Sequence, residues 1–151
     1  MGNPKSMRLT LKTKVNSNIS AVINGFDQKL FLALNPPFPQ VKLKQFDGCE
    51  TGDVVSLELN FLLFKQVWTS EITEESRTAD RWYFVDVGVK LPFFLSGWEH
   101  EHIVEQEDSG SVIIDHIQYR TGTLFTDLLM YPALMLQFAY RRPIYRRFFR
   151  Q

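Results

Sequence analysis

Strict alternation of apolar and polar residues over long stretches is the feature that most limits how this chain can fold. From Met7 to Val15, arginine, lysine and threonine residues stand between apolar ones. The same period of two recurs over four later segments: 55–63, 65–74, 81–90 and 98–119. A period of two places alternate side chains on opposite faces of a strand. We therefore predict an antiparallel sheet that buries one of its faces.

Two short helices are predicted between the first strand and the rest of the sheet. The segment 16–18 supplies side chains that cap helix N-termini, and helical stretches follow at 19–24 and 27–34. The prolines of segment 35–39 then end the second helix, because proline has no N–H to donate and pushes the preceding residue out of the helical region. A short alternating strand at 41–44 returns the chain to the sheet.

A long helix is predicted at the C-terminal end. The segment from Gly122 to Phe149 carries a stripe of apolar residues at helical spacing. Pro132 and Pro143 are expected to kink this helix or split it. The members of the stripe are Leu124, Phe125, Leu128, Leu129, Ala133, Leu136 and Tyr140. With 151 residues and no repeat or linker, the chain is expected to form one domain over residues 1–151.

Composition excludes several classes of protein. Cys49 is the one cysteine, so neither an intrachain disulfide nor a thiolate zinc site can form, and a reducing cytosol is the expected compartment. The first twenty residues are polar and basic, unlike a secretory signal, and the least polar run, 128–140, is shorter than the roughly 20 residues that a membrane helix needs. The 17 acids balance 17 lysines and arginines, so no net charge steers the chain toward nucleic acid. We expect a cytoplasmic protein with no nucleic-acid partner.

Arginines gather at the end of the chain in a cationic amphipathic pattern. Five of them follow Tyr140 at near-helical spacing, and no acid lies among them. They are Arg141, Arg142, Arg146, Arg147 and Arg150. One interpretation is a solvated helix end whose cations complement the helix dipole. The alternative is a surface that contacts an anionic membrane or an acidic partner.

The register of the last hairpin decides which side chains share a face, because a slip of one residue moves every side chain to the other face. A two-residue turn at 108–109 pairs His102 with Asp115 and separates an aromatic and apolar face from an acidic one. A three-residue turn at 108–110 would place His102 opposite His116. We favour the first register because it buries fewer unpaired charges.

In the favoured register, His100, His102 and Asp115 project to the concave face, and Asp86 on the preceding strand joins them. Three interpretations remain open. The carboxylates accept hydrogen bonds from the imidazoles in a satisfied polar cluster, or the cluster orients the polar head of a ligand, or it is a metal or acid–base catalytic site. A carboxylate beside an imidazole is expected to raise the pKa of the imidazole and to make the pair a proton donor.

No motif for nucleophilic catalysis or phosphate binding competes with this cluster. The chain has no G-x-S-x-G, no P-loop and no G-x-G-x-x-G, and Cys49 has no histidine near it in the sequence. Aromatic residues make up 14% of the chain but alternate with aliphatic ones, which favours core packing over base stacking. We predict no cofactor and assign no catalytic residue from these patterns.

Short motifs recur along nearly the whole chain in a recognisable order. Trp98, His100 and His102, followed by Asp115 and Tyr119, form W-x-H-x-H and D-x-x-x-Y. Other motifs are Pro36-Pro37-Phe38, Trp68 to Ile72, Phe84-Val85-Asp86 and Phe138-Ala139-Tyr140-Arg141. Together they resemble the motifs of the ligand-binding SRPBCC proteins, the superfamily of START domains and the birch-pollen allergen. Two elements differ, because Arg120-Thr121-Gly122 replaces the family's P-x-G and Leu91-Pro92-Phe93 replaces its G-P-F.

The resemblance implies an α+β helix-grip, or START-like, fold. In this fold a curved antiparallel sheet of about seven strands wraps around a long C-terminal helix, and two short helices after the first strand close one end. A strongly curved sheet and a helix cannot touch along their whole length, so either side chains fill the gap or a cavity remains. Members of the superfamily bind lipids, sterols, polyketides and other hydrophobic molecules, and some relatives are cyclases or dehydratases.

We therefore predict that the chain binds or carries a hydrophobic small molecule in an internal cavity. The expected apolar wall consists of Leu57, Leu59, Trp68, Phe84, Trp98, Ile117, Tyr119, Leu128 and Leu136. The expected polar end consists of Asp86, His100, His102 and Asp115. One alternative is a cyclase, dehydratase or hydrolase that uses His100 or His102 as acid or base. The other is a membrane-surface or protein-interaction module that uses the arginine-rich helix.

Overall fold

A computed structural model describes residues 5–150, and its largest element is one sheet of seven antiparallel strands. The strands are β1 (Met7–Val15), β2 (Gln40–Phe46), β3 (Val54–Asn60), β4 (Lys65–Arg77), β5 (Arg81–Lys90), β6 (Gly97–Glu107) and β7 (Gly110–Arg120). Their order across the sheet is β1-β7-β6-β5-β4-β3-β2. The first strand therefore pairs with the last, and β1 and β2 form the two edges.

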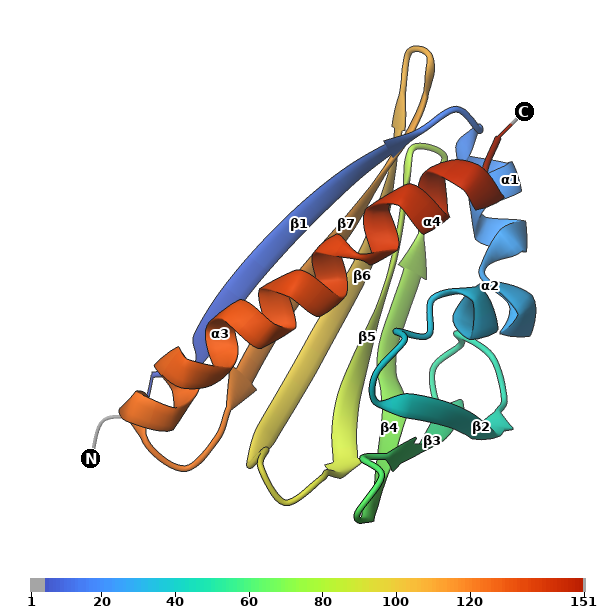
Figure 1. Ribbon diagram of the computed structural model, residues 1–151. Helices are drawn as coiled ribbons and strands as arrows, with labels where there is room; N and C mark the ends of the chain where they lie inside the picture. The colour runs from blue at the N-terminus through green and yellow to red at the C-terminus, as the bar shows by residue number, and fades with distance from the viewer. Residues whose placement is uncertain (1–4, 151) are drawn as a thin grey trace.

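Four helices accompany the sheet. They are α1 (Ile19–Gly25), α2 (Gln28–Ala33), α3 (Leu124–Ala139) and α4 (Arg141–Phe148). Figure 1 shows α3 and α4 running diagonally across the concave face, while α1 and α2 lie beside the C-terminal end of α4. Register shifts in β2 and β4 mark bulges, which bend strands and increase their twist. This is the helix-grip fold that the sequence motifs predict.

The predicted register of the last hairpin is confirmed. His102 pairs with Asp115, and the turn consists of Asp108 and Ser109. Gly110 follows this turn with a φ of +157°, and a Cβ there would lie 2.2 Å from the carbonyl oxygen of Val15. Only glycine therefore allows β7 to begin so close to the end of β1.

The end of β3 differs from the prediction. The alternating pattern predicted a strand to Leu63, whereas β3 ends at Asn60 and a tight turn leads into β4. Leu62 adopts a positive φ of 75°, and its N–H donates to the side-chain oxygen of Asn60. The apolar residues of this turn, Leu62 and Leu63, are consequently exposed. β4 also continues to Arg77, three residues beyond the alternating segment 65–74.

The predicted stripe of the C-terminal helix faces away from the sheet. Leu128 is 55% exposed and Leu136 is 72% exposed, whereas Leu134 and Phe138 on the opposite side are buried. Both sides of α3 are apolar, so helical spacing could not decide which one the sheet covers. The prediction that Leu128 and Leu136 lie in the interior was therefore wrong.

The helix breaks at Tyr140, three residues before Pro143, and it does not break at Pro132. Pro143 has no N–H to donate to the carbonyl of Ala139, so the hydrogen-bond ladder is interrupted between α3 and α4. Pro132 leaves the carbonyl of Leu128 unpaired in the same way, but both residues lie on the exposed side, where water can hydrate that carbonyl. α3 therefore continues through Pro132.

Two clusters of buried side chains hold the helices to the sheet. The first gathers α1, α2, β5 and α4 around Phe26, whose ring contacts those of Trp82, Phe84, Tyr145 and Phe149. The second joins β1, β6 and β7 to α3 and includes Leu9, Leu11, Trp98, Ile117, Tyr119, Leu134 and Phe138. A cavity and a group of polar side chains lie beside these two clusters.

Candidate ligand cavity

A cavity of about 680 Å³ lies on the concave side of the sheet. Strands β2 to β6, the loop after α2 and one side of α3 form its walls, which are mostly apolar. Five predicted wall residues line it: Leu57, Leu59, Trp68, Phe84 and Trp98. Leu32 and Phe38, which are about half exposed, also belong to the lining, so the cavity reaches the surface.

Four other predicted wall residues do not line the cavity. Ile117 and Tyr119 are buried in the second core cluster, and the Tyr119 hydroxyl donates to the backbone oxygen of Asp127 at 2.7 Å. Leu128 and Leu136 point to the exposed side of α3, for the reason given above. β7 therefore packs against the helix, whereas β2 to β5 bound the open space.

Several lining residues were missed by the sequence analysis. Phe31, Val41, Leu43, Phe61, Phe94, Met130, Leu134 and Phe138 are apolar members of the wall. The alternation of Val41 and Leu43 with lysines could have found the two residues on β2. Gln137 and Arg141 also reach the cavity, and no sequence signal distinguished them.

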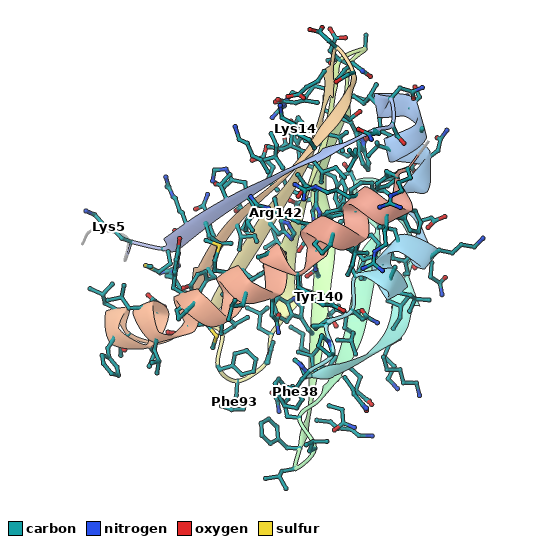
Figure 2. The ribbon with its side chains drawn as sticks, turned by 45° about the horizontal axis from the view of Figure 1, so that its top comes forward. Lys5, Lys14, Phe38, Phe93, Tyr140 and Arg142 are labelled. Carbon is teal, nitrogen blue, oxygen red and sulfur yellow. The ribbon has the colours of Figure 1, made fainter. Side chains whose placement is uncertain are left out.

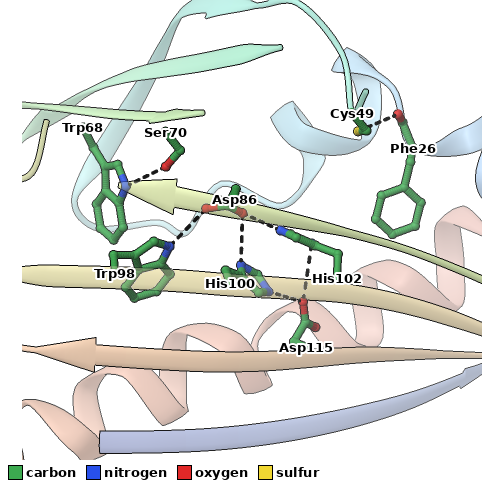
Figure 3. A network of polar contacts seen from close by, with 9 residues as sticks. All are labelled: Phe26, Cys49, Trp68, Ser70, Asp86, Trp98, His100, His102 and Asp115. Carbon is green, nitrogen blue, oxygen red and sulfur yellow. Dashed lines mark hydrogen bonds and ion pairs between the residues drawn. The ribbon is translucent and has the colours of Figure 1, made fainter. Parts of the chain in front are cut away.

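The four predicted polar residues come together at one wall, next to Trp98 (Figure 3). His100 Nε2 lies 2.8 Å from Asp115 Oδ1, and His102 Nε2 lies 2.7 Å from Asp86 Oδ2. Because an ionised carboxylate only accepts, each imidazole donates from Nε2. Trp98 Nε1 donates to the other oxygen of Asp86 at 3.2 Å. Each histidine therefore bonds to the carboxylate of a neighbouring strand.

The histidine rings also pack against one another and against aromatic neighbours. Their centroids are 3.6 Å apart, and the ring of His102 stacks on Phe84 at 4.3 Å. The ring of His100 meets Phe138 of α3 edge to face. Both rings are almost fully buried, at 3% exposure. The cluster is consequently held by packing as well as by hydrogen bonds.

The pKa values in this cluster differ from the sequence-based expectation. Burial, together with the neighbouring His102, lowers the pKa of His100 to about 4, and the hydrogen bond to Asp115 does not offset this effect. Asp115 and Asp86 do raise the pKa of His100, as expected, but burial and His102 outweigh them, so the expected net rise does not occur. Burial raises the pKa of Asp86, but the hydrogen bond from His102, the charges of His100 and His102 and the hydrogen bond from Trp98 together outweigh it and leave this pKa lowered. Near neutral pH, a neutral His100 faces ionised carboxylates.

The same residues can be compared with a metal site. Ligand-type atoms of Asp86, His100 and His102 lie within 4.8 Å of one another. Both Nε2 atoms already donate to carboxylates, and they face opposite sides, since Asp115 lies on β7 and Asp86 on β5. His102 Nδ1 is buried without a hydrogen-bond partner and lies 3.9 Å from Asp115, and His100 Nδ1 lies 3.6 Å from Asp86. This geometry fits a hydrogen-bonded polar cluster better than a metal centre.

Asp86 and Asp115 occupy different positions relative to the cavity. Asp86 belongs to the lining and its side chain is 15% exposed, whereas Asp115 is 1% exposed and lies outside the lining. Burial raises the pKa of Asp115, but the hydrogen bond from His100 and the charges of His100, Arg141 and His102 together outweigh it and leave this pKa lowered. Asp115 therefore positions His100, whereas Asp86 can contact a molecule in the cavity directly.

The arginine-rich segment divides between the interior and the surface. The guanidinium of Arg141 lies 4.4 Å from the centroid of the Phe138 ring and forms part of the cavity wall. Arg146, Arg147 and Arg150 are exposed. Arg146 and Arg147 occupy the last turn of α4, a position in which cations complement the helix dipole.

Cys49 carries no nucleophilic role in this arrangement. Its thiol donates to the backbone oxygen of Phe26 at 3.7 Å, and burial raises its pKa to about 12. A thiol with so high a pKa holds almost no thiolate near neutral pH, and the thiolate is the reactive form.

Comparison with known proteins supports the fold. No protein-family model matches the sequence, and no curated protein is similar to it. Among solved structures, an aromatase/cyclase from a Streptomyces species matches with a TM-score of 0.68 and 12% identity, over 91% of this chain and 90% of that one. A norcoclaurine synthase mutant from Thalictrum, in complex with a transition-state analogue, matches with a TM-score of 0.62 and 10% identity, over 92% of each chain. A major latex-like protein from Panax ginseng matches with a TM-score of 0.55 and 13% identity, over 92% of this chain and 99% of that one.

These similarities show that the chain has the helix-grip fold of the START and birch-pollen-allergen type. Within residues 5–150, no helix combines the length and the apolar character that crossing a bilayer requires.

Proposed function

We propose that this helix-grip protein binds or carries a hydrophobic small molecule whose apolar body fills the cavity and whose polar end meets Asp86 and His102. The observation that carries the proposal is that the cavity wall has a large apolar part and a small polar part. Apolar side chains form most of it, with leucine and phenylalanine the most frequent, and the imidazoles and Asp86 gather at one place. Sites of this kind favour apolar ligands with a few fixed polar contacts.

The size of the cavity is sufficient for binding by burial. A ligand that removes roughly 300 Å² of apolar surface from water gains roughly 7 kcal/mol before the costs of association. The cavity volume of about 680 Å³ lies within the range of small-molecule sites. Lipid-, sterol- or polyketide-like molecules are the classes that this volume and this wall fit.

The polar end gives the ligand its orientation. Asp86 accepts hydrogen bonds from His102 and Trp98 and has lone pairs to spare, because a carboxylate accepts up to about four. A ligand hydroxyl or another hydrogen-bond donor at this wall would therefore find a free acceptor position on the Asp86 carboxylate. Among the solved structures of this fold, the norcoclaurine synthase complex with a transition-state analogue supports a small-molecule site.

Native mass spectrometry of protein purified from cells tests the proposal. We expect a bound organic adduct in the wild type and its loss in Val55→Trp, because Val55 lines the cavity and an indole there occupies ligand space. The matched control is Val67→Trp, which should keep the adduct. Val67 is next to the cavity-lining Trp68 on the same strand, so its side chain lies on the other face of the sheet, where it pairs with Glu58. A wild type that carries no adduct and takes up no lipophilic fluorescent probe would overturn the proposal.

A second candidate is a cyclase-, dehydratase- or hydrolase-type enzyme in the same cavity. The observation that favours it is the buried His102–Asp86 pair at the cavity wall, since such pairs transfer protons. The match to a structure described as an aromatase/cyclase supports it as well. The test is the mass of the adduct during incubation. An enzyme changes that mass in the wild type and not in His102→Gln, whereas a carrier leaves it constant in both.

A further inference from the structure

The outer face of α3 is apolar over its whole length. Its exposed apolar side chains are Leu124, Phe125, Leu128, Leu129, Leu136 and Tyr140, and Leu129 is 67% exposed. These residues lie on one side of the helix, and the exposed Pro132 and Ala133 fill the interval between Leu129 and Leu136, so the stripe is continuous. At 1.5 Å per residue, the 16 residues of α3 make the stripe about 24 Å long. A stripe of this length on the surface is an interaction site rather than a scatter of single side chains.

A group of phenylalanines continues the apolar surface beside the cavity opening. Phe38, Phe61, Phe64, Phe93 and Phe94 come from three different loops, and their rings touch in a chain with centroid distances between 5.1 and 6.0 Å. Phe93 is 74% exposed. In Figure 2, Phe93 and Phe38 lie near one another below Tyr140 of α3. Phe38 and Ala133 of α3 line the same cavity, so the stripe and the phenylalanines meet at its opening.

The charge of this surface indicates what covers it. Asp127 is the only acid in the sequence between Leu124 and Arg150, and it is buried. The exposed side of α4 carries Arg146 and Arg147. An apolar helix face that is followed by cations and lacks exposed acids is the pattern of helices that lie in the interface of anionic membranes.

We infer that the protein docks on an anionic lipid surface through the outer face of α3, the phenylalanines at the cavity opening and the arginines of α4. A symmetric pair of chains fits this surface less well, because it would bring the same arginines together without acids to pair them. Docking in this orientation places the cavity opening against the lipid. The inference concerns the surface alone and does not depend on a ligand in the cavity.

Flotation of the full chain with lipid vesicles tests the inference. We expect the protein to float with vesicles of phosphatidylcholine and phosphatidylglycerol and to float less with phosphatidylcholine alone. Leu129→Glu should weaken vesicle binding roughly tenfold or more. In the bound protein the substitution would place a charge where the leucine side chain contacts lipid. The matched control is Thr10→Glu, which adds the same charge at an exposed position of β1 and should bind like the wild type.

The arginines are tested by neutralisation. Arg146→Gln with Arg147→Gln should weaken binding to the anionic vesicles about 30-fold, since each cation near such a surface contributes about 1 kcal/mol. Arg8→Gln with Lys12→Gln, on the exposed side of β1, is the control that should have little effect. Absence of wild-type flotation with both vesicles, or equal flotation of Leu129→Glu and wild type, overturns the inference. So does a lipid-free dimer in sedimentation velocity that Leu129→Glu dissociates, because a second copy would then cover the face.

Discussion

At one end of the concave face, the ring of Phe26 lies between those of Trp82, Phe84, Tyr145 and Phe149, with centroids 5.4 to 6.2 Å away. At the other end, α3 and strands β2 to β5 enclose about 680 Å³ of open space. The helix α4 covers the first end, and α3, which precedes it in the chain, covers the second. At the first, aromatic side chains from a loop, a strand and a helix are long enough to meet. At the second, the sheet bends away and the facing side chains do not reach one another.

The polar cluster marks the boundary between the two ends. His102 stacks on Phe84 of the packed end, and His100 touches Phe138 of the helix. The comparison indicates that stability and binding reside in different parts of the interior. Substitutions at the packed end should cost stability, and substitutions at the hollow end should change what the cavity holds.

Phe26→Ala should produce the largest loss. Removing a ring that four others contact leaves a cavity that rigid neighbours cannot fill, and such changes cost about 4 kcal/mol of the free energy of unfolding. Equilibrium denaturation in urea measures it. A loss below about 1 kcal/mol would contradict the view that this end is tightly packed.

Asp115→Ala should cost about 3 kcal/mol, because it leaves the buried N–H of His100 without its acceptor. The control is Glu99→Ala, which removes an exposed acid from the same hairpin and should cost less than about 0.5 kcal/mol. Chemical denaturation compares the two variants, and equal losses would show that the boundary cluster adds nothing to stability.

Acidification should destabilise the protein by roughly 2 kcal/mol between pH 6.5 and pH 4. In this window the unfolded chain protonates His100, whereas the folded protein holds its pKa at about 4, so the unfolded state binds more protons. The lowered pKa values of Asp86 and Asp115 extend the loss to lower pH. His100→Gln should show a shallower slope when the free energy of unfolding is measured against pH, and an unchanged slope would assign the effect to other groups.

Phe61→Ala makes the same change as Phe26→Ala at the hollow end and should cost only about 1 kcal/mol. Phe61 is partly exposed and two of the rings that it contacts, Phe38 and Phe64, are exposed, so removal of its ring leaves space that water can fill rather than a closed cavity. Binding of a lipophilic fluorescent probe should weaken in this variant and remain close to wild type in Phe26→Ala. The opposite pattern would place the binding site at the packed end.

Much of the fold could be predicted from the sequence because strand alternation and turn chemistry are local. The pairing of His102 with Asp115 followed from the turn at Asp108 and Ser109, and with it came the position of the polar cluster. The spacing of apolar residues does not reveal which of two apolar faces of a helix packs against the sheet. α3 has leucines on both sides, and the sheet covers the side with Leu134 and Phe138.

Two properties of the site depend on surroundings that the sequence does not display. The pKa of His100 is set chiefly by burial, whereas adjacency to Asp115 alone suggested the opposite direction. Arg141 was grouped with the surface arginines, yet the first turn of α4 places it in the cavity wall. Both cases arise from tertiary packing between segments far apart in the chain.

The interruption at Tyr140 divides the closing helix into two bodies with separate attachments. α4 is fixed at the aromatic end by Tyr145 and Phe149, while α3 alone spans the hollow end. Because Pro143 cannot donate a hydrogen bond to Ala139, no continuous hydrogen-bond ladder joins the two helices. Leu134 and Phe138 hold α3 in the second cluster, whereas Tyr145 and Phe149 hold α4 in the first, so each part of the closing helix depends on a different region of the core.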